Sequence, residues 1–173
     1  GSEDIYVSQT QIKRFSIRTG DIIAGQVRPP KEGERYFSLI RLEAVNNQSL
    51  TVLKNRVSFS KLIPIYPDEQ LKLEIGATPI SGRIIDMMAP IGKGQRALVV
   101  SPPKAGKTTI LKEIANSISE NHPEVLIKVL LIDERPEEVT DMQRSINGEV
   151  MYSTFDEPPE QHVRISELVL ESA

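Results

Sequence analysis

One segment in the middle of the chain has the residue order of a nucleotide-phosphate loop. The apolar run Ala97–Val100 predicts a buried strand, and apolar residues from Ile110 to Ile118 recur at helical spacing. Between them, Ala105-Gly106-Lys107-Thr108 matches the closing half of a P-loop. Because a strand, a loop and a helix follow one another in this order, we expect an α/β domain with a parallel sheet.

The residue types of this loop suit phosphate binding. Backbone amides at a helix N-terminus point toward a bound anion, and the helix dipole favours its negative charge. Gly106 permits close backbone approach, Lys107 reaches the terminal phosphates, and the Thr108 hydroxyl is a ligand for Mg²⁺. The pattern asks for glycine at position 101, where the chain has Ser101. A helix start without any ligand is the alternative, and the strand–loop–helix order favours nucleotide binding.

Composition limits the other functions of the chain. Its 173 residues are 39% hydrophobic and 26% charged, which is ordinary for a globular protein. The net charge of -3 does not support nucleic-acid binding over the whole chain, so such a site must rest on a local patch. Cysteine is absent, which excludes disulfides and thiolate zinc sites and fits a reducing cytoplasm. No apolar run approaches the ~20 residues of a membrane span.

The sequence changes character once along its length, which predicts two parts. Residues 5–60 hold short apolar or alternating runs separated by turn residues, and they predict a small antiparallel β unit. These runs cover residues 22–27, 36–45 and 50–53. The second part predicts a strand over 126–132 buried on both faces, a helix from Pro136, a strand over 150–154 and a helix after Pro159. We therefore expect a β unit over residues 3–58, a linker over 59–74 and an α/β domain over 75–173.

Acidic residues follow the predicted strand at 126–132. Asp133 and Glu134 fall at its C-terminal end, where open α/β sheets place ligand-facing groups. Glu134 can orient or deprotonate the water that attacks a γ-phosphate. Alternatively, Asp133 caps the helix that starts at Pro136, and Glu134 is solvated beside it. The position one strand–helix unit after the P-loop favours the catalytic interpretation of Glu134.

Aromatic residues of the predicted β unit lie among basic residues. Tyr6, Tyr36 and Phe37 are close in sequence to Lys13, Arg14, Arg28, Lys31 and Arg35. Such interleaving suits single-stranded nucleic acid, through base stacking and attraction to the backbone. A core of aromatic residues with a solvated basic face explains the spacing equally well. Glu34 dilutes the positive charge, although a carboxylate can accept a hydrogen bond from the amino group of cytosine.

Motifs spread over nearly the whole chain resemble the family of bacterial transcription termination factor Rho. They are the segments 4–8, 28–37, 90–96, 102–108, 131–140 and 154–158. The resemblance implies an α/β RecA-like P-loop domain with an incomplete parallel sheet, preceded by a small, also incomplete, β oligonucleotide-binding (cold-shock-like) unit. It further implies an ATP-dependent RNA translocase or helicase of the bacterial cytoplasm that terminates transcription. Its cofactors would be ATP and Mg²⁺. Its partners would be pyrimidine-rich single-stranded RNA, the identical subunits of a homo-hexamer and the RNA polymerase complex, and it would not bind a membrane.

The same resemblance implies roles for particular residues. Glu134 and Lys107 would be catalytic, and Thr108 would hold Mg²⁺. The nucleotide-binding residues would be Gly92, Lys93, Gly94, Gln95, Arg96, Ala97, Lys104, Ala105, Gly106, Lys107, Thr108, Thr109 and Arg135. The RNA-binding residues would be Asp4, Ile5, Tyr6, Glu34, Arg35 and Tyr36.

The chain is expected to be a fragment that is not fully competent for hydrolysis by itself. No strand follows the last predicted helix to supply the aspartate that usually supports magnesium in P-loop ATPases. Two alternatives stay open. One is a rotary ATP synthase-type RecA-like subunit, which shares the Pro90-Ile91-Gly92 lead-in, and the other is an RNA-binding module with an inactive P-loop remnant. ATPase activity measured with and without single-stranded RNA distinguishes them.

Overall fold

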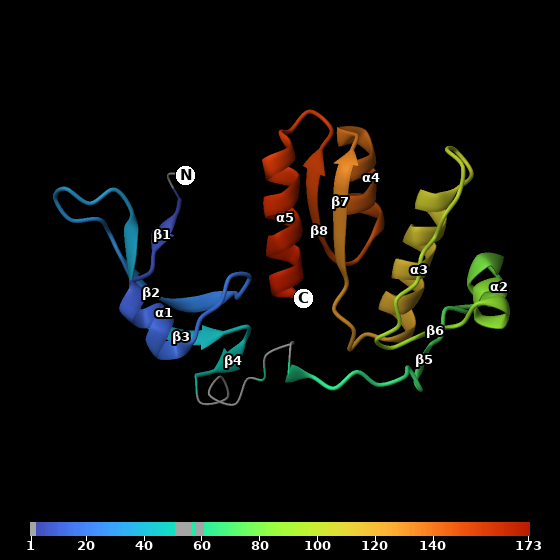
Figure 1. Ribbon diagram of the computed structural model, residues 1–173, viewed down its shortest axis with the longest axis horizontal. Coiled ribbons are helices and arrows are strands. Elements are labelled where there is room, and N and C mark those ends of the chain that lie inside the picture. Colours follow the sequence, from blue (N-terminus) through green and yellow to red (C-terminus); the bar gives the residue numbers. More distant parts are fainter. Residues whose placement is uncertain (1–2, 51–56, 58–60) are drawn as a thin grey trace. The chain divides into compact units, whose positions relative to one another are not determined.

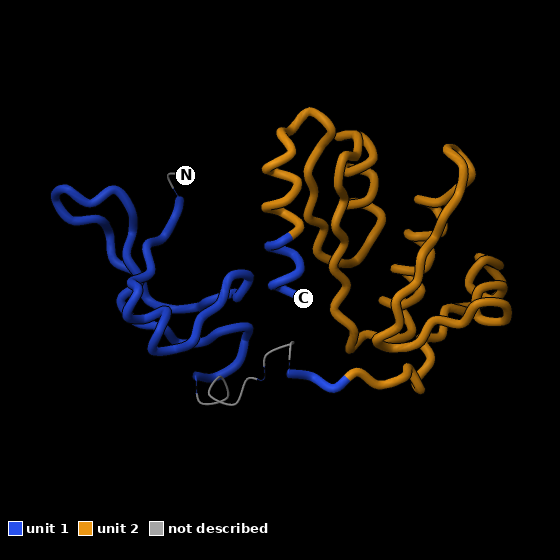
Figure 2. The backbone as a smooth tube through the Cα atoms, viewed as in Figure 1, with its two compact units in different colours: residues 1–63, 167–173 blue, residues 64–166 orange. Residues whose placement is uncertain are grey.

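The computed structural model describes residues 3–50, 57 and 61–173 (Figure 1). The chain divides into two compact units, one of residues 1–63 with 167–173 and one of residues 64–166 (Figure 2). The predicted strand at 50–53 lies, apart from Leu50, outside the described residues, as does the predicted domain boundary at 58–59. Among the described helices, none has the length and apolarity needed to cross a membrane.

The first unit is a small mixed sheet with one short helix. Its elements are β1 (Ile5–Tyr6), α1 (Gln9–Phe15), β2 (Ile23–Arg28), β3 (Phe37–Val45) and β4 (Gln48–Ser49). The strand order is β1-β3-β2, and β4 also pairs with β3. Both β2 and β4 are antiparallel to β3, whereas β1 is parallel to it, so the expected antiparallel unit is only partly antiparallel.

Two bulges set which side chains of β3 reach the core. The pairing with β2 shifts register between Ala24 and Gly25 and again between Gln26 and Val27. Each shift adds one residue to β3, so the buried Leu39, Leu42 and Val45 share one face at a spacing of three instead of two. Gly25 is required at the first shift, because a Cβ there would lie 2.2 Å from the Arg41 carbonyl oxygen. The bulged hairpin therefore forms the hydrophobic core of this unit.

Helix α1 was not predicted from the sequence, although its start carries a recognisable signal. The Ser8 side chain accepts a hydrogen bond from the Gln11 backbone amide, and the Gln11 side chain accepts one from the Ser8 amide. This reciprocal pair is a capping box, and it stabilises the first turn of a helix. Gln11 also donates to the carbonyls of Leu39 and Ile40, which ties α1 to β3.

The second unit combines short strands and longer helices. Its elements are β5 (Gln70–Leu71), α2 (Ile80–Met88), β6 (Ile91–Gly92), α3 (Lys107–Asn121), β7 (Lys128–Glu134), α4 (Pro136–Ser145), β8 (Glu149–Thr154) and α5 (Pro159–Ser172) up to residue 166. Strands β7 and β8 pair in parallel through the crossover helix α4, which agrees with the predicted βαβ order. Strands β5 and β6 form a separate antiparallel pair, and neither they nor α2 were predicted.

The predicted buried strand at Ala97–Val100 is wrong in this structure. No strand forms there among the described residues, and Leu98 and Val100 are 86% and 79% exposed. An apolar run becomes a buried strand only when its amide and carbonyl groups pair with a neighbouring strand. Within the described part of the chain, β7 and β8 pair only with each other. The expectation that both faces of strand 126–132 are buried is also wrong, since β7 begins at Lys128, is half-buried and leaves Leu126 exposed.

Side chains fix the start of the second unit onto α2 and α3. The Asp86 carboxylate accepts hydrogen bonds from the backbone amides of Leu73 and Glu74, at 3.0 and 2.9 Å. His122, the C-cap of α3, accepts one from the Lys72 amide at 2.9 Å through Nε2. These bonds satisfy the backbone of a segment that has little regular secondary structure.

Candidate nucleotide and RNA sites

The backbone before α3 turns through two residues in the left-handed region. Lys104 and Gly106 both have positive φ, of 63° and 90°. A Cβ on Gly106 would meet no atom within 4 Å, so glycine is favoured there by the backbone conformation and not by crowding. No side chain of the described residues caps α3. Its first amide groups are therefore available to a bound anion.

Lys107 and Thr108 line a cavity of about 240 Å³ together with Glu134. The cavity lies between α3, β7 and α4, and Glu138 contributes a second carboxylate. Apolar side chains complete the wall: Leu111, Leu130, Leu131, Ile132 and Met142. The structure thus brings one ammonium, one hydroxyl and two carboxylates together in a largely apolar hollow.

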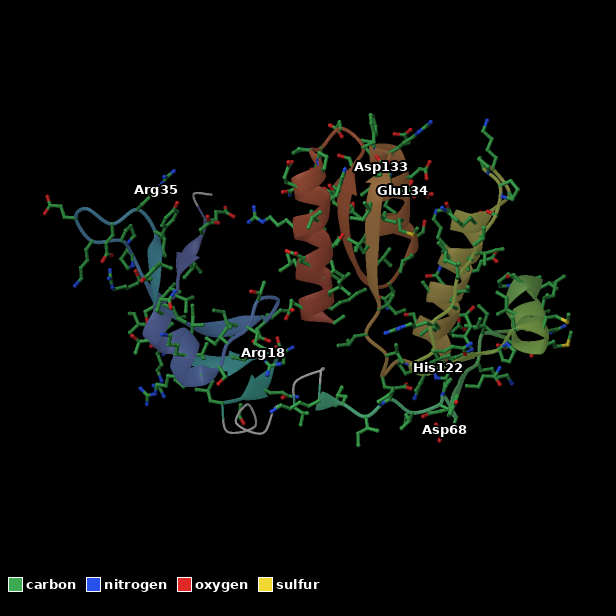
Figure 3. The ribbon with its side chains drawn as sticks, in the orientation of Figure 1. Arg18, Arg35, Asp68, His122, Asp133 and Glu134 are labelled. Carbon is green, nitrogen blue, oxygen red and sulfur yellow. The ribbon has the colours of Figure 1, made fainter. Side chains whose placement is uncertain are left out.

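A bulge at the end of β7 sets the position of Glu134. Ile132 pairs with Ser153 and Glu134 with Thr154, so Asp133 is the extra residue, and its φ is 59°. Asp133 is exposed and Glu134 half-buried. Figure 3 labels both residues near the end of β7. The helix α4 has Arg135 as its N-cap and has no side-chain cap, so the alternative that Asp133 caps this helix is wrong.

Several groups act on the charge of Glu134. Its pKa is raised, first because burial disfavours the carboxylate and then because Glu138 shares a hydrogen bond with it and repels its charge. The positive charge of Lys107 acts in the opposite direction. A carboxyl group with a raised pKa is a stronger base than an ordinary exposed glutamate, which suits it to accept a proton from water.

The lead-in segment 92–97 begins with Gly92, the last residue of β6, and turns at Lys93 and Gly94. Lys93 pairs with Glu69 at 2.6 Å and Glu124 at 3.2 Å, and both carboxylates raise its pKa. Gln95 closes the turn by accepting from the Gly92 amide. The residues predicted to bind nucleotide that do not line the cavity of Lys107 are Gly92, Lys93, Gly94, Gln95, Arg96, Ala97, Lys104, Ala105, Gly106, Thr109 and Arg135. Their role stays a prediction.

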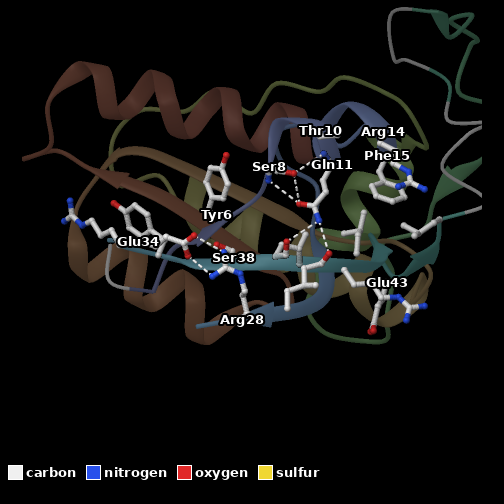
Figure 4. A pocket seen from close by; sticks show the side chains of 17 residues that line it. Tyr6, Ser8, Thr10, Gln11, Arg14, Phe15, Arg28, Glu34, Ser38 and Glu43 are labelled. Atoms are coloured by element: carbon white, nitrogen blue, oxygen red, sulfur yellow. Dashed lines mark hydrogen bonds and ion pairs between the residues drawn. The ribbon is translucent and has the colours of Figure 1, made fainter. Parts of the chain in front are cut away.

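The first unit carries a larger hollow of about 1220 Å³ (Figure 4). It is lined by β1, α1, β3 and the β2–β3 loop, and four of the predicted RNA-binding residues line it: Tyr6, Glu34, Arg35 and Tyr36. Tyr6 is 56% exposed and Tyr36 half-buried, and neither belongs to the core around Leu42. The alternative that these two tyrosines are core residues is therefore wrong. Asp4 and Ile5 are exposed and do not line the hollow.

Glu34 is held by a partner that the sequence reasoning missed. Its two carboxylate oxygens accept from the Arg28 guanidinium at 2.7 and 2.9 Å, and one also accepts from the Lys31 amide at 3.1 Å. The Arg28 hydrogen bond, helped by that of Lys31, lowers the pKa of Glu34 to about 2. In this structure Glu34 closes the β2–β3 loop.

Arg35 lies over the ring of the adjacent Tyr36. Its guanidinium carbon is 5.5 Å from the ring centroid, within the range of a cation–π contact. Arg14 makes a similar contact with Phe15 at 5.4 Å. Three exposed arginines, Arg14, Arg35 and Arg41, and two accessible tyrosine rings thus line the hollow, which is a chemistry suited to stacked bases and phosphates.

Comparison with known proteins assigns each unit a domain type. Residues 1–51 match the family described as Rho termination factor, RNA-binding domain. Residues 81–166 match the ATP synthase alpha/beta family, nucleotide-binding domain. The chain is therefore a nucleotide-binding protein that also carries an RNA-binding domain.

Alignments with similar proteins extend over all or nearly all of the chain. It is 60% identical to transcription termination factor Rho of Bacillus subtilis over 172 residues, which is 99% of this chain and 40% of that protein. It is 55% identical to transcription termination factor Rho of Pseudomonas aeruginosa, in an alignment that covers 100% of this chain and 42% of that protein. It is 56% identical to the corresponding protein of Karelsulcia muelleri, with 99% of this chain and 46% of that protein covered. The chain spans less than half the length of these relatives. It belongs to the transcription termination factor Rho family.

Proposed function

We propose that this chain binds ATP and Mg²⁺ at the start of α3 and single-stranded RNA at the hollow of the first unit. It acts as part of an ATP-dependent RNA translocase or helicase that terminates transcription in the bacterial cytoplasm. The observation that carries the proposal is the cavity shared by Lys107, Thr108 and Glu134. The whole protein works as a homo-hexamer with the RNA polymerase complex and uses pyrimidine-rich RNA.

Each residue of the cavity has a defined task in this proposal. Lys107 contacts the terminal phosphates, and the Thr108 hydroxyl ligates the metal ion. The uncapped start of α3 and the hydroxyl in its first turn fit these ligands. When bound, Mg²⁺ neutralises charge on the phosphates. Glu134, with its raised pKa, orients the attacking water and takes up its proton.

The remaining predicted residues complete the two sites. Tyr6 and Tyr36 stack on bases, and Arg35 contacts the RNA backbone or a base edge, with Asp4, Ile5 and Glu34 at the margin. The nucleotide is further contacted by residues 92–97, 104–106 and 109 and by Arg135. The corresponding domains are a cold-shock-like RNA-binding domain over 3–58 and a RecA-like ATPase domain over 75–173, joined by a linker over 59–74.

The first test removes the ammonium group of Lys107. Lys107→Ala leaves phosphate charge uncompensated, and a hydrogen bond to a charged group is worth about 1.5–3 kcal/mol. We expect the Kd for ATP to rise roughly 10- to 100-fold in isothermal titration calorimetry. Lys61→Ala, at an exposed lysine that lines neither cavity, is the matched control. Equal affinities for the two variants would refute the assignment of Lys107.

The second test removes the basicity of Glu134. In the full-length protein, Glu134→Gln binds ATP normally but loses general base catalysis, which contributes roughly 10²- to 10⁴-fold to turnover. Steady-state ATP hydrolysis with single-stranded RNA measures the loss of kcat. Glu137→Gln, at an exposed acid in the first turn of α4, is the control. Turnover of Glu134→Gln within a few-fold of the parent would mean that this carboxylate is not the base.

The match of residues 81–166 to the ATP synthase alpha/beta family favours a second candidate, a rotary ATP synthase-type subunit. The RNA-binding match at residues 1–51 weighs against it. ATP hydrolysis that rises on addition of cytosine-rich RNA supports the RNA translocase. Hydrolysis that is indifferent to RNA supports the rotary type, and RNA binding without any hydrolysis supports an RNA-binding module with an inactive P-loop.

A further inference from the structure

A buried serine joins β8 to α5 through two polar side chains. Ser153 is 0% exposed, and its hydroxyl donates to the Glu157 carboxylate. The same hydroxyl oxygen lies 2.7 Å from Nδ1 of His162. Glu157 lies in the turn after β8, and His162 lies in α5 (Pro159–Ser172). We name these three residues the Ser153 cluster.

The proton count of the Ser153 cluster defines its chemistry. The serine hydroxyl has one hydrogen, which it gives to Glu157, and a carboxylate only accepts. His162 must therefore donate from Nδ1 to the serine oxygen. A serine nucleophile needs the opposite arrangement, in which the imidazole accepts the serine proton. The cluster is thus a fixed connection between elements and not a nucleophilic site.

The turn held by this cluster also holds the backbone of Glu134. Thr154 is the register partner of Glu134, and the Phe155 amide donates to the Glu134 carbonyl at 3.2 Å. The Glu157 amide donates to the Thr154 carbonyl at 3.0 Å and closes the turn. One side of the turn is therefore bonded to Glu134, and the other side is bonded to the buried Ser153.

We infer that Ser153, Glu157 and His162 are positioning residues for Glu134. Glu134 follows the bulge at Asp133, so the regular ladder with β8 is interrupted just before it. The Phe155 hydrogen bond is the next backbone bond after this interruption, and the Ser153 cluster fixes the turn that supplies it. The inference rests on the proposed catalytic role of Glu134.

The first experiment compares two substitutions of His162 in the full-length protein. His162→Asn keeps an N–H donor near the position of Nδ1, whereas His162→Leu removes it. Displacement of a catalytic group by about 1 Å can cost roughly 10²-fold in rate. We expect His162→Leu to displace the Glu134 carboxylate by less than this and to lower kcat about tenfold. The KM for ATP stays within about twofold, and His162→Asn retains the parent kcat within about twofold. Ser166→Ala, which removes the bond to the His162 carbonyl, is the control.

The second experiment measures the connection without any turnover. Hydrogen exchange followed by NMR reports on the Phe155 amide, and we expect faster exchange in His162→Leu than in His162→Asn. If His162→Leu does not fold, Glu157→Ala and Glu157→Gln form an equivalent pair, since only glutamine retains an acceptor for Ser153.

The outcomes separate the inference from the proposed function. Equal kcat or equal Phe155 exchange in the two variants of a pair overturns the positioning role, even when Glu134→Gln is slow. Normal turnover of Glu134→Gln instead overturns the proposed function and the positioning role with it. Loss of kcat with faster exchange, rescued by the conservative variant, supports both.

Discussion

Removal of the Tyr36 ring tests whether the hollow of the first unit is the RNA site. In this structure the ring is half-buried and lies outside the hydrophobic core. Tyr36→Ala should therefore leave the fold of the β unit intact while it removes a surface on which a base can stack. We expect weaker RNA binding and an unchanged affinity for ATP.

The size of this effect follows from the contacts of the ring. The Arg35 guanidinium lies over one face of the Tyr36 ring, 5.5 Å from its centroid. The other face is left for the stacking of one base. Stacking of one base on an aromatic side chain is worth ~1–3 kcal/mol. The Kd for RNA should therefore rise roughly 5- to 150-fold. Arg35→Ala should in addition flatten the salt dependence, because fewer counterions are released when a phosphate contact is lost.

A fluorescence-anisotropy titration of the full-length protein with a short cytosine-rich RNA measures these changes. Tyr66→Ala is the matched control, since Tyr66 is 94% exposed and does not line the hollow. Equal RNA affinity in Tyr36→Ala and Tyr66→Ala would refute the assignment and place the RNA site elsewhere.

Two further predictions concern the first unit. Leu42→Ala removes a buried side chain from the core around β3 and should lower the free energy of unfolding by roughly 2–5 kcal/mol in urea denaturation, whereas a change below about 1 kcal/mol would contradict the described core. NMR titration should give the Glu34 carboxyl a pKa of about 2. The contribution of its ion pair to the stability of the loop is then complete above pH 4.5, the ordinary pKa of a glutamate, and is lost as the pH falls toward 2. Arg28→Ala should return this titration toward 4.5, and a midpoint that does not move would show that Arg28 is not the cause.

Much of the second unit is predictable because its signals are local. Helix α4 begins at Pro136 and α5 at Pro159, where proline fits the first helical position. The parallel pair of β7 and β8 follows from the alternation of apolar runs with a helical pattern. The run Ala97–Val100 fails for a non-local reason, because strand formation depends on a pairing partner and not on apolarity alone.

The first unit is harder to predict because its core depends on two bulges. A period of two along β3 would bring Leu39, Arg41 and Glu43 to one face, whereas the register shifts bring Leu39, Leu42 and Val45 together. No alternation rule detects such a shift. The Ser8 capping box was readable from the sequence, but the bond from Gln11 to the Leu39 carbonyl depends on contacts 28 residues apart.

The residues of the candidate sites also divide into those that a local sequence motif predicts and those that meet only after folding. The P-loop motif predicts Lys107 and Thr108 from adjacent residues, and the motif around Glu134 predicts a carboxylate at the end of a strand. The Arg28–Glu34 pair and the Ser153 cluster have no sequence motif, since both depend on side chains that meet after folding. Sequence reasoning assigned Glu34 to RNA directly and did not predict that Arg28 occupies both of its oxygens.

Two glutamates of this chain lie in surroundings that shift their pKa in opposite directions. Glu34 is paired with Arg28, and its pKa falls to about 2, so it stays ionised and cancels the charge of one arginine near the hollow. Positive charge for RNA is then left to the other arginines that line the hollow, Arg14, Arg35 and Arg41. Glu134 is partly desolvated and faces Glu138, and its pKa rises, so it takes up a proton more readily. The first environment suits a permanent structural charge, and the second suits a group that must change its protonation during a reaction.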